Sequence, residues 1–140
     1  MAKYDGQLIR LTSLSIKELK EEFHQAPPIS RVLGCDACDT SQILPRCFYV
    51  EEIGVMAITS NHAEAIDFLL EATDHDDKFV RFNAYGHLGD VDSPRKRDVI
   101  IAVIEDGIKK EKDEKILNLA KESLAKLKGI KEFKKCCGIS

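Results

Sequence analysis

The sequence predicts an all-α protein, an α-α superhelix of short stacked helical hairpins. From about Ser15 onward, apolar residues recur at intervals of three and four, which places them on one face of a helix. The sequence has no sustained alternation of apolar and polar residues, the pattern that indicates a half-buried strand. One short apolar pattern also recurs in three of the predicted helices, as expected of a chain built from repeated units.

The 140 residues, 44% of them hydrophobic and 32% charged, fit one globular domain with an adequate core. We expect a single domain over residues 1–140, with a repeat-like core at about 45–128. Residues 1–44 then supply an N-terminal capping helix and a cysteine-containing loop, and residues 129–140 a lysine-rich tail. No apolar run approaches the roughly 18 to 20 residues that a membrane span needs, and the first residues lack the apolar core of a secretory signal. We therefore expect a cytoplasmic protein that does not associate with membranes.

A capping box predicts the start of the first helix, at about 16–26. Ser15 can accept a hydrogen bond from the backbone amide of Glu18, whose side chain can bind the Ser15 amide in return. Pro27 and Pro28 end this helix, because proline disrupts a helix interior. A narrow apolar stripe indicates a helix that covers the end of the core, and it comprises Ile16, Leu19 and Phe23.

Two helices are expected after a stretch of mixed polarity at 28–45. Residues near 45–59 are predicted to be helical, and Asn61 and Glu64 have cap-like spacing at the start of the next helix. The apolar face of that next helix comprises Ile66, Leu69 and Leu70.

The following helix is predicted to begin at a cap supplied by Asp76 or Asp77 and to end at Gly89. Glycine suits that position because helices commonly end on a residue in the left-handed conformation. Apolar residues lie along one face of this helix at steps of four, namely Val80, Ala84 and Leu88.

Two more helices complete the core. Ser93 and Pro94 predict the start of one, since the missing amide of proline is harmless in a first helical turn, and Gly107 is expected to end it. Its predicted buried stripe is Val99, Ile100, Val103 and Ile104. After a charged linker at 109–112, a last long helix is expected to end at Gly129. Its apolar residues are Ile116, Leu117, Ala120, Leu124 and Leu127.

Three of these helices share a pattern in which a small residue lies between two larger apolar residues, at steps of four. The triplets are Val50-Gly54-Ile58, Val80-Ala84-Leu88 and Ile116-Ala120-Leu124. A small middle residue lets a neighbouring helix approach closely, as stacked hairpins require. Three hairpin-like units are about the number that a solenoid needs before neighbours bury each other's apolar faces.

The segment 74–90 resembles a HEAT-like repeat of the armadillo type, and a looser resemblance covers roughly 45–128. In this segment an acidic turn precedes a Val-Arg pair at 80–81, and the helix ends in Leu-Gly at 88–89. The resemblance implies stacked helical hairpins that serve as an interaction scaffold, and we expect the partner to be another protein.

The same resemblance supplies candidate residues for partner contact. Asp77 and Arg81 correspond to the acid and base that link neighbouring repeats, and an ordinary ion pair between them, four positions apart on one helix, is the alternative. Tyr85 is the third candidate. One enzyme branch of the family holds a di-iron centre with His-Glu pairs, but each of the four histidines here is followed by another residue type, so that chemistry is not carried over.

Charge is unevenly distributed along the chain, whose formal net charge is -3. Residues 51–77 are acidic and contain no Lys or Arg, whereas residues 109–135 contain ten lysines. These two regions could attract each other between copies, so self-association is a further expectation. The net acidity and the single aromatic residue among the lysines argue against nucleic acid as the partner.

The five cysteines give the most specific chemical signal. Cys35 and Cys38 can reach one metal ion, or each other, across a single turn. Cys47, Cys136 and Cys137 could complete a zinc or iron-sulfur site, so a metal-binding or redox accessory protein is the alternative function. Buried or idle reduced thiols are the simpler interpretation, since an odd number of cysteines cannot pair fully.

Catalytic motifs are not found in the sequence. It has no glycine-rich phosphate loop, no nucleophile elbow and no metalloprotease helix. The sequence therefore favours a non-enzymatic protein-interaction scaffold that needs no cofactor.

Overall fold

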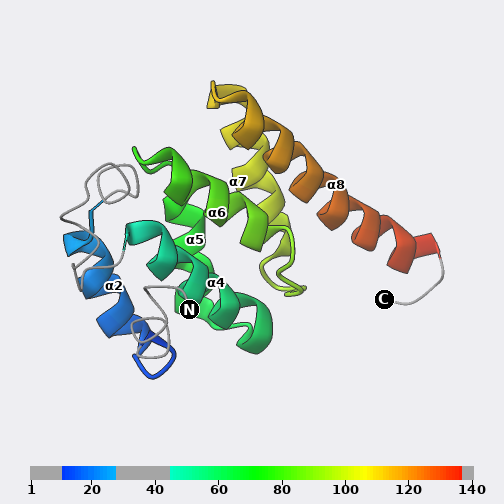
Figure 1. Cartoon of the computed structure of the whole chain (residues 1–140). Helices are drawn as coiled ribbons and strands as arrows, with labels where there is room; N and C mark the ends of the chain where they lie inside the picture. Colours follow the sequence, from blue (N-terminus) through cyan, green and yellow to red (C-terminus); the bar gives the residue numbers. More distant parts are fainter. Residues whose placement is uncertain (1–10, 28–44, 137–140) are drawn as a thin grey trace, which may run out of the picture.

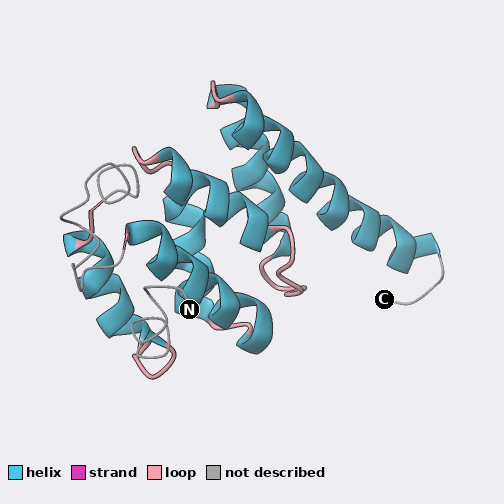
Figure 2. Cartoon of the chain, viewed as in Figure 1, coloured by secondary structure: helices cyan, strands magenta, loops and turns pink. Residues whose placement is uncertain are grey.

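The computed structural model describes residues 11–27 and 45–136, with side chains as far as Gly129. Within these ranges the chain forms six α-helices and no strand, so the predicted all-α class is confirmed (Figure 2). The helices are α2 (Ile16–Gln25), α4 (Arg46–Ser60), α5 (Ala63–Ala72), α6 (Lys78–Leu88), α7 (Arg97–Lys110) and α8 (Glu114–Cys136). None of the described helices is long and apolar enough to cross a membrane.

The helices lie in two layers (Figure 1). In one layer α4, α6 and α8 lie side by side, and α2 packs against the outer side of α4. In the other layer α5 packs behind α4 and α6, while α7 packs behind α8. Neighbouring helices in the first layer are therefore separated in sequence by a helix of the second layer, which is the arrangement expected of stacked hairpins.

The capping box at the start of α2 is confirmed. The Ser15 hydroxyl accepts from the Glu18 amide at 3.2 Å, and the Glu18 carboxylate accepts from the Ser15 amide at 3.1 Å. The predicted apolar stripe is buried, and it faces α4 at the end of the core. Local hydrogen bonding thus fixes the start of α2, and packing against α4 holds it in place.

Small residues do let the helices of the first layer approach closely. Gly54 of α4 faces the ring of His87 on α6, and a Cβ atom added at Gly54 would overlap that ring. Ala84 and Ala120, the corresponding residues of α6 and α8, are fully buried. The middle position of the recurring pattern is therefore small because a neighbouring helix occupies the space of a larger side chain.

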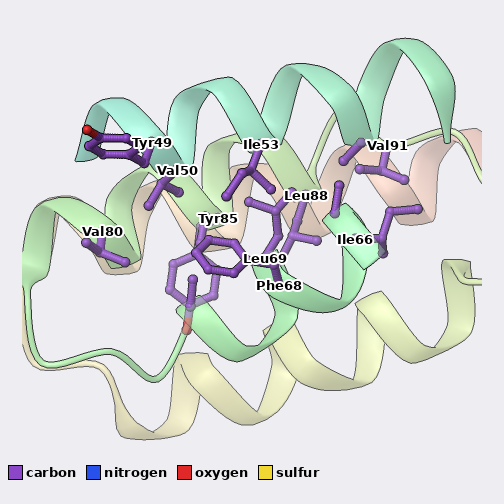
Figure 3. Packing of buried hydrophobic residues seen from close by; sticks show 14 of the residues in the cluster. Tyr49, Val50, Ile53, Ile66, Phe68, Leu69, Val80, Tyr85, Leu88 and Val91 are labelled. Atoms are coloured by element: carbon purple, nitrogen blue, oxygen red, sulfur yellow. The ribbon is translucent and has the colours of Figure 1, made fainter. Parts of the chain in front are cut away.

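Apolar side chains of three helices fill the space between the layers. Val50 and Ile53 of α4, Leu69 of α5 and Leu88 of α6 all point into it (Figure 3). All four are fully buried, and each such side chain contributes roughly 1.5–3 kcal/mol by leaving water. This shared core holds α5 and α6 in place and so positions the turn that connects them.

The junction between α4 and α5 differs from the prediction. Asn61 has φ 50°, in the left-handed region, and ends α4 instead of beginning α5. His62 is the N-cap of α5, and its Nδ1 accepts from the Ala65 amide at 3.4 Å. Asparagine tolerates the left-handed conformation better than other residues with a side chain, so it allows this tight reversal.

Three glycines were predicted to end helices, and this is confirmed for Gly89 and wrong for Gly107 and Gly129. Gly89 follows α6 but has φ -64°, so it is not left-handed. A Cβ atom there would lie 2.7 Å from the Ser123 hydroxyl oxygen, so glycine is needed for the approach of α8. Gly107 lies inside α7, where a Cβ atom would overlap the Tyr85 hydroxyl. Gly129 lies inside α8, which continues to Cys136.

The start of α7 is also later than predicted. The Ser93 carbonyl accepts from the amides of Lys96 and Arg97, at 3.1 and 2.9 Å, so these residues form a turn and the helix begins at Arg97. Ile100 and Ile104 are buried as predicted, whereas Val99 is half exposed. The buried stripe of α7 is thus narrower than the sequence suggests.

Candidate functional site

Arg81 joins two segments that are far apart in the sequence. Its Nε donates to Glu111 Oε1 at 2.9 Å and its Nη2 donates to Glu111 Oε2 at 3.2 Å. Its Nη1 donates to the carbonyls of His75 and Asp76, at 2.9 and 3.0 Å. One side chain from the first turn of α6 therefore ties the turn that precedes α6 to the residue that ends α7.

Glu111 is the buried partner in this pair, with 5% of its side chain exposed. Burial by itself raises the pKa of its carboxyl group. The hydrogen bond from Arg81, the backbone amides of Lys112 and Asp113 and the positive charge of Arg81 together outweigh burial and lower that pKa. Glu111 is therefore ionised at neutral pH and holds the linker between α7 and α8 against α6.

Asp77 does not pair with Arg81, so the alternative interpretation, an ordinary ion pair four positions apart, is wrong for these two residues. Asp77 Oδ1 caps α6 by accepting from the Phe79 amide at 2.9 Å. Its Oδ2 lies 3.9 Å from Nε of Arg46, and it is buried without a hydrogen-bond partner among the described residues. Arg46 donates instead to the Ala26 carbonyl, at 3.0 Å.

Two arginine–carboxylate pairs therefore connect successive parts of the stack. Arg46 and Asp77 are 77 - 46 = 31 residues apart, and Arg81 and Glu111 are 111 - 81 = 30 residues apart. In both pairs the arginine lies in the first turn of a first-layer helix, and its acid lies close to the start of the next one. Asp77 and Arg81 were predicted to link neighbouring repeats, with an ion pair between the two as the alternative, and each pairs instead with a residue about 30 positions away.

A cleft of about 580 Å³ opens beside the second of these pairs. It is bordered by the end of α5, the turn that leads into α6, the last two turns of α7 and the linker into α8. Its apolar wall consists of Leu70, Ala102 and Val103. The Arg81–Glu111 pair lies at its edge, so the pair fixes two of the segments that border the cleft.

Tyr85 forms the base of this cleft. Its side chain is 1% exposed, and its hydroxyl lies directly against the backbone of Gly107. None of the described residues forms a hydrogen bond with this hydroxyl. Burial, and next the charge of Glu111, raise the pKa of the phenol, so it is protonated at neutral pH. A partner bound here can reach little of Tyr85 beyond its hydroxyl.

Charged side chains from α7 and from the turn after α5 meet at the mouth of the cleft. Lys110 Nζ lies 3.2 Å from Asp106 Oδ2 on its own helix and 3.5 Å from Asp74 Oδ1 on the opposite side. All three side chains are well exposed, so this bridge is easily broken. The Asp74–Lys110 contact joins the acidic and basic regions of the sequence within a single chain.

His75 connects the border of the cleft to the end of the core. Its Nδ1 accepts from the Asp77 amide at 2.9 Å, and its ring lies edge-on to Phe23 of α2, with centroids 5.5 Å apart. Burial, and next the charge of Arg46, lower the pKa of the imidazole. The neutral ring therefore serves as a hydrogen-bond acceptor that shapes the turn before α6.

Of the five cysteines, Cys47 alone has a described side chain, so the predicted cysteine site lies mostly outside the described residues. Cys47 is buried in the first turn of α4, and burial, together with the nearby charge of Asp77, raises the pKa of its thiol to about 11. Cys35, Cys38 and Cys137 lie outside the described residues, and Cys136 lies at the end of α8, where side chains are not described. Across 11–27 and 45–129, no group of three or more His, Cys, Asp or Glu side chains could hold a metal ion.

The structure thus unites two of the three predicted contact residues, Arg81 and Tyr85, at one cleft, and places Asp77 at the preceding link. Gly107 and Lys110, which also line the cleft, were not among the predicted contact residues. A glycine in the interior of a helix is the one sequence signal that could have indicated close packing at this point. No protein-family model, no curated protein and no solved structure matches this chain.

Proposed function

We propose that the chain is a non-enzymatic protein-interaction module that holds its partner in the cleft between α5 and α7. The observation that carries this proposal is the cleft itself, with an apolar wall, a charged mouth and a volume of about 580 Å³. Binding sites commonly combine apolar walls with a few placed polar groups in cavities of this size. The resemblance of 74–90 to a HEAT-like repeat supports the same function, because members of that family are mostly interaction scaffolds.

Preformed geometry supports binding at this cleft. The turn before α6 and the linker after α7 border the cleft, and Arg81 holds both through four hydrogen bonds. A partner that enters a site already held in shape loses less free energy to ordering. The cleft is therefore suited to binding without a large rearrangement of the stack.

The chemical state of the lining groups favours binding over proton transfer. Arg81 is committed to Glu111 and to two backbone carbonyls, and His75 is committed to the Asp77 amide. The raised pKa of Tyr85 keeps its phenol protonated near neutral pH. Arg81 and His75 thus stabilise the shape of the cleft, and Leu70, Ala102 and Val103 form its apolar contact surface.

Filling the cleft without disturbing the core tests this function. Ala102 is exposed and lines the cleft, and Ala125 is an exposed alanine of α8, so Ala102→Trp and Ala125→Trp are matched variants. Both variants and the wild-type chain would be immobilised, and the proteins captured from the cells that express the chain would be quantified by mass spectrometry. We expect Ala102→Trp to lose partners that the wild type and Ala125→Trp retain. Identical captured sets for all three proteins would contradict the proposal.

A further inference from the structure

We propose that the cleft recognises the basic side chain of its protein partner, a lysine or arginine that enters between Asp74 and Asp106. This inference rests on the proposed interaction function and specifies the chemistry of the partner. It is carried by four features of the cleft: two cations that are already engaged within the chain, available carboxylates, an apolar channel and a phenol hydroxyl at its base.

Four carboxylates line the cleft against three cations; two of these cations, Arg81 and Lys110, are already engaged within the chain, and the third, Lys112, is exposed. Every nitrogen of the Arg81 guanidinium already donates, either to Glu111 or to the carbonyls of the α5–α6 turn. Lys110 lies between Asp106 and Asp74. By contrast, Asp74 and Asp106 are largely exposed and keep acceptor capacity, since an ionised carboxylate has about four lone-pair sites.

Two helix ends add to the preference for a cation. The last turn of α5 contributes Leu70 to the cleft, and the last turns of α7 contribute Gly107 and Lys110. A helix carries partial negative charge at its C-terminus, and this charge favours cations within about one turn. Both second-layer helices that border the cleft therefore direct their negative ends towards it.

The walls of the cleft fit the stem of a long basic side chain. Leu70 and Val103 are half-buried apolar residues, and Ala102 leaves open space beside them. Lysine and arginine carry apolar stems that pack well against such surfaces while the charged head stays near polar groups. At the base, the Tyr85 side chain is 1% exposed, and its hydroxyl, which forms no hydrogen bond with the described residues, can accept one from an ammonium or guanidinium group.

Lys110 occupies the position that the partner's basic group would take. Its ammonium group bridges the two carboxylates at 3.2 and 3.5 Å, and its side chain is exposed. Exposed ion pairs are weak, so a basic side chain whose stem is also held by the apolar wall can displace Lys110. Lys110 therefore acts as an internal competitor for the site.

A titration with short peptides tests the inference directly. The full isotope-labelled chain would be titrated with a capped glycine–lysine–glycine tripeptide, and the amide resonances of Ala102 and Gly107 would be followed by NMR. We expect saturable shifts with a dissociation constant on the order of 1 mM, and none with the same peptide acetylated on its lysine. Equal shifts for both peptides, or none for either up to about 10 mM, would overturn the inference.

Two matched variants sharpen the test. Lys110→Met removes the internal competitor, whereas Lys109→Met removes the same charge from the neighbouring exposed residue. We expect Lys110→Met to tighten binding of the lysine peptide roughly threefold and Lys109→Met to leave it unchanged. Asp106→Asn should weaken binding. If Lys110→Met and Lys109→Met have the same effect, general charge and not the position of Lys110 governs binding, and the inference fails.

Failure of this inference can be told apart from failure of the proposed function. If Ala102→Trp loses partners but the lysine peptide does not bind, the cleft is an interaction site for a partner of different chemistry. Sedimentation of the wild type and of Asp106→Asn adds a further outcome. Self-association that Asp106→Asn abolishes would make a second copy of this chain the occupant, and it would overturn the assignment to a separate partner protein.

Discussion

Arg81 and Glu111 form a two-pronged ion pair across 30 residues of sequence, with Nε–Oε1 at 2.9 Å and Nη2–Oε2 at 3.2 Å. This geometry matches the planar guanidinium to the planar carboxylate, which makes the pair stronger and more directional than a lysine contact. The glutamate is almost completely buried and the arginine is mostly buried. The pair therefore determines where the α7–α8 linker lies relative to the α5–α6 turn.

Replacing Glu111 with glutamine should destabilise the fold. Glutamine keeps the size of the side chain but removes its charge and one acceptor of Arg81. We expect the free energy of unfolding at pH 7 to fall by about 2 kcal/mol, less than for a fully buried pair because Arg81 is partly exposed. Urea unfolding monitored by circular dichroism measures this change.

The same substitution at an exposed pair is the matched control. Glu105 contacts Lys128 at 3.0 Å, and both side chains are about half exposed. Glu105→Gln should change the free energy of unfolding by less than about 0.5 kcal/mol. Equal effects at positions 105 and 111 would show that the buried pair has no special role.

The loss of stability caused by Glu111→Gln should also depend on pH. Its pKa in the folded chain lies below the usual 4.5, so the folded state favours the ionised form. Stability from this group is therefore fully present above about pH 4.5 and is lost as the pH falls through the lowered pKa. The stability difference between the wild type and Glu111→Gln should be constant near neutral pH and should narrow below about pH 4.5.

Gly107→Ala should destabilise the chain, although alanine is the better helix former. The new Cβ atom would overlap the Tyr85 hydroxyl, whose ring is fixed in the core. Overpacking of this kind costs roughly 1–3 kcal/mol, which exceeds the gain of up to about 1 kcal/mol in helix propensity. Tyr85→Phe removes the overlapping oxygen, so the double variant should show a coupling of at least about 0.5 kcal/mol.

Gly129→Ala is the control for that change. Gly129 lies inside α8, and no atom of the described residues lies within 4 Å of a Cβ added there. Here only helix propensity changes, so we expect stabilisation of up to about 1 kcal/mol. Thermal and urea unfolding should thus give opposite signs for one substitution at two helical glycines, and the same sign at both would refute the packing role of Gly107.

Several features that depend on neighbours in sequence were predictable, although the cap at Asn61 and the start of α7 were not. Ser15 and Glu18 lie three residues apart, so their capping box could be recognised without knowledge of the fold. The close packing at the small residues Gly54 and Ala84 was also predictable, because both occupy the middle position of the recurring apolar pattern. The helical class and the approximate position of each described helix followed from these local signals.

Features that depend on distant contacts were not predictable. Arg81 has acidic residues nearby in sequence, but its partner is Glu111, which only folding brings close. In the sequence, Gly107 and Gly129 both resemble glycines that end helices. In the structure, a Cβ atom at Gly107 would overlap Tyr85, whereas a Cβ atom at Gly129 would meet none of the described residues. The cleft was missed for the same reason, because its lining comes from three helices and two connecting segments.

His75 should make stability sensitive to mildly acidic pH. Its neutral Nδ1 accepts from the Asp77 amide, and protonation would remove this acceptor. Because its pKa in the folded chain lies below the usual 6.5, the unfolded chain binds a proton first, and stability should fall as the pH drops below about 6.5. Arg46 and His24 oppose protonation of His75, whereas Asp76 and Asp77 favour it.

His75→Asn tests this effect, because the asparagine side-chain oxygen can accept from the Asp77 amide without titrating. Unfolding free energies would be measured for the wild type and the variant at pH 7.5 and at pH 5.5. We expect the wild type to lose more stability than the variant over this interval. Parallel losses would mean that protonation of His75 does not determine the stability of the turn.

Cys47 should be a slow target for alkylation in the folded chain. Its thiol pKa is raised from 9.0 to about 11, so at pH 8 the reactive thiolate is roughly 100-fold scarcer than in an exposed cysteine. Burial of Cys47 in the first turn of α4 also keeps the reagent away from its thiol. The chain would be treated with iodoacetamide for set times, either folded or unfolded in guanidinium. Mass spectrometry of the peptide that contains Cys47 would then give the rate of alkylation in each condition. We expect labelling in guanidinium to be at least about 100-fold faster. Equal rates in the two conditions would place Cys47 at an accessible surface, where it could serve as a metal ligand after all.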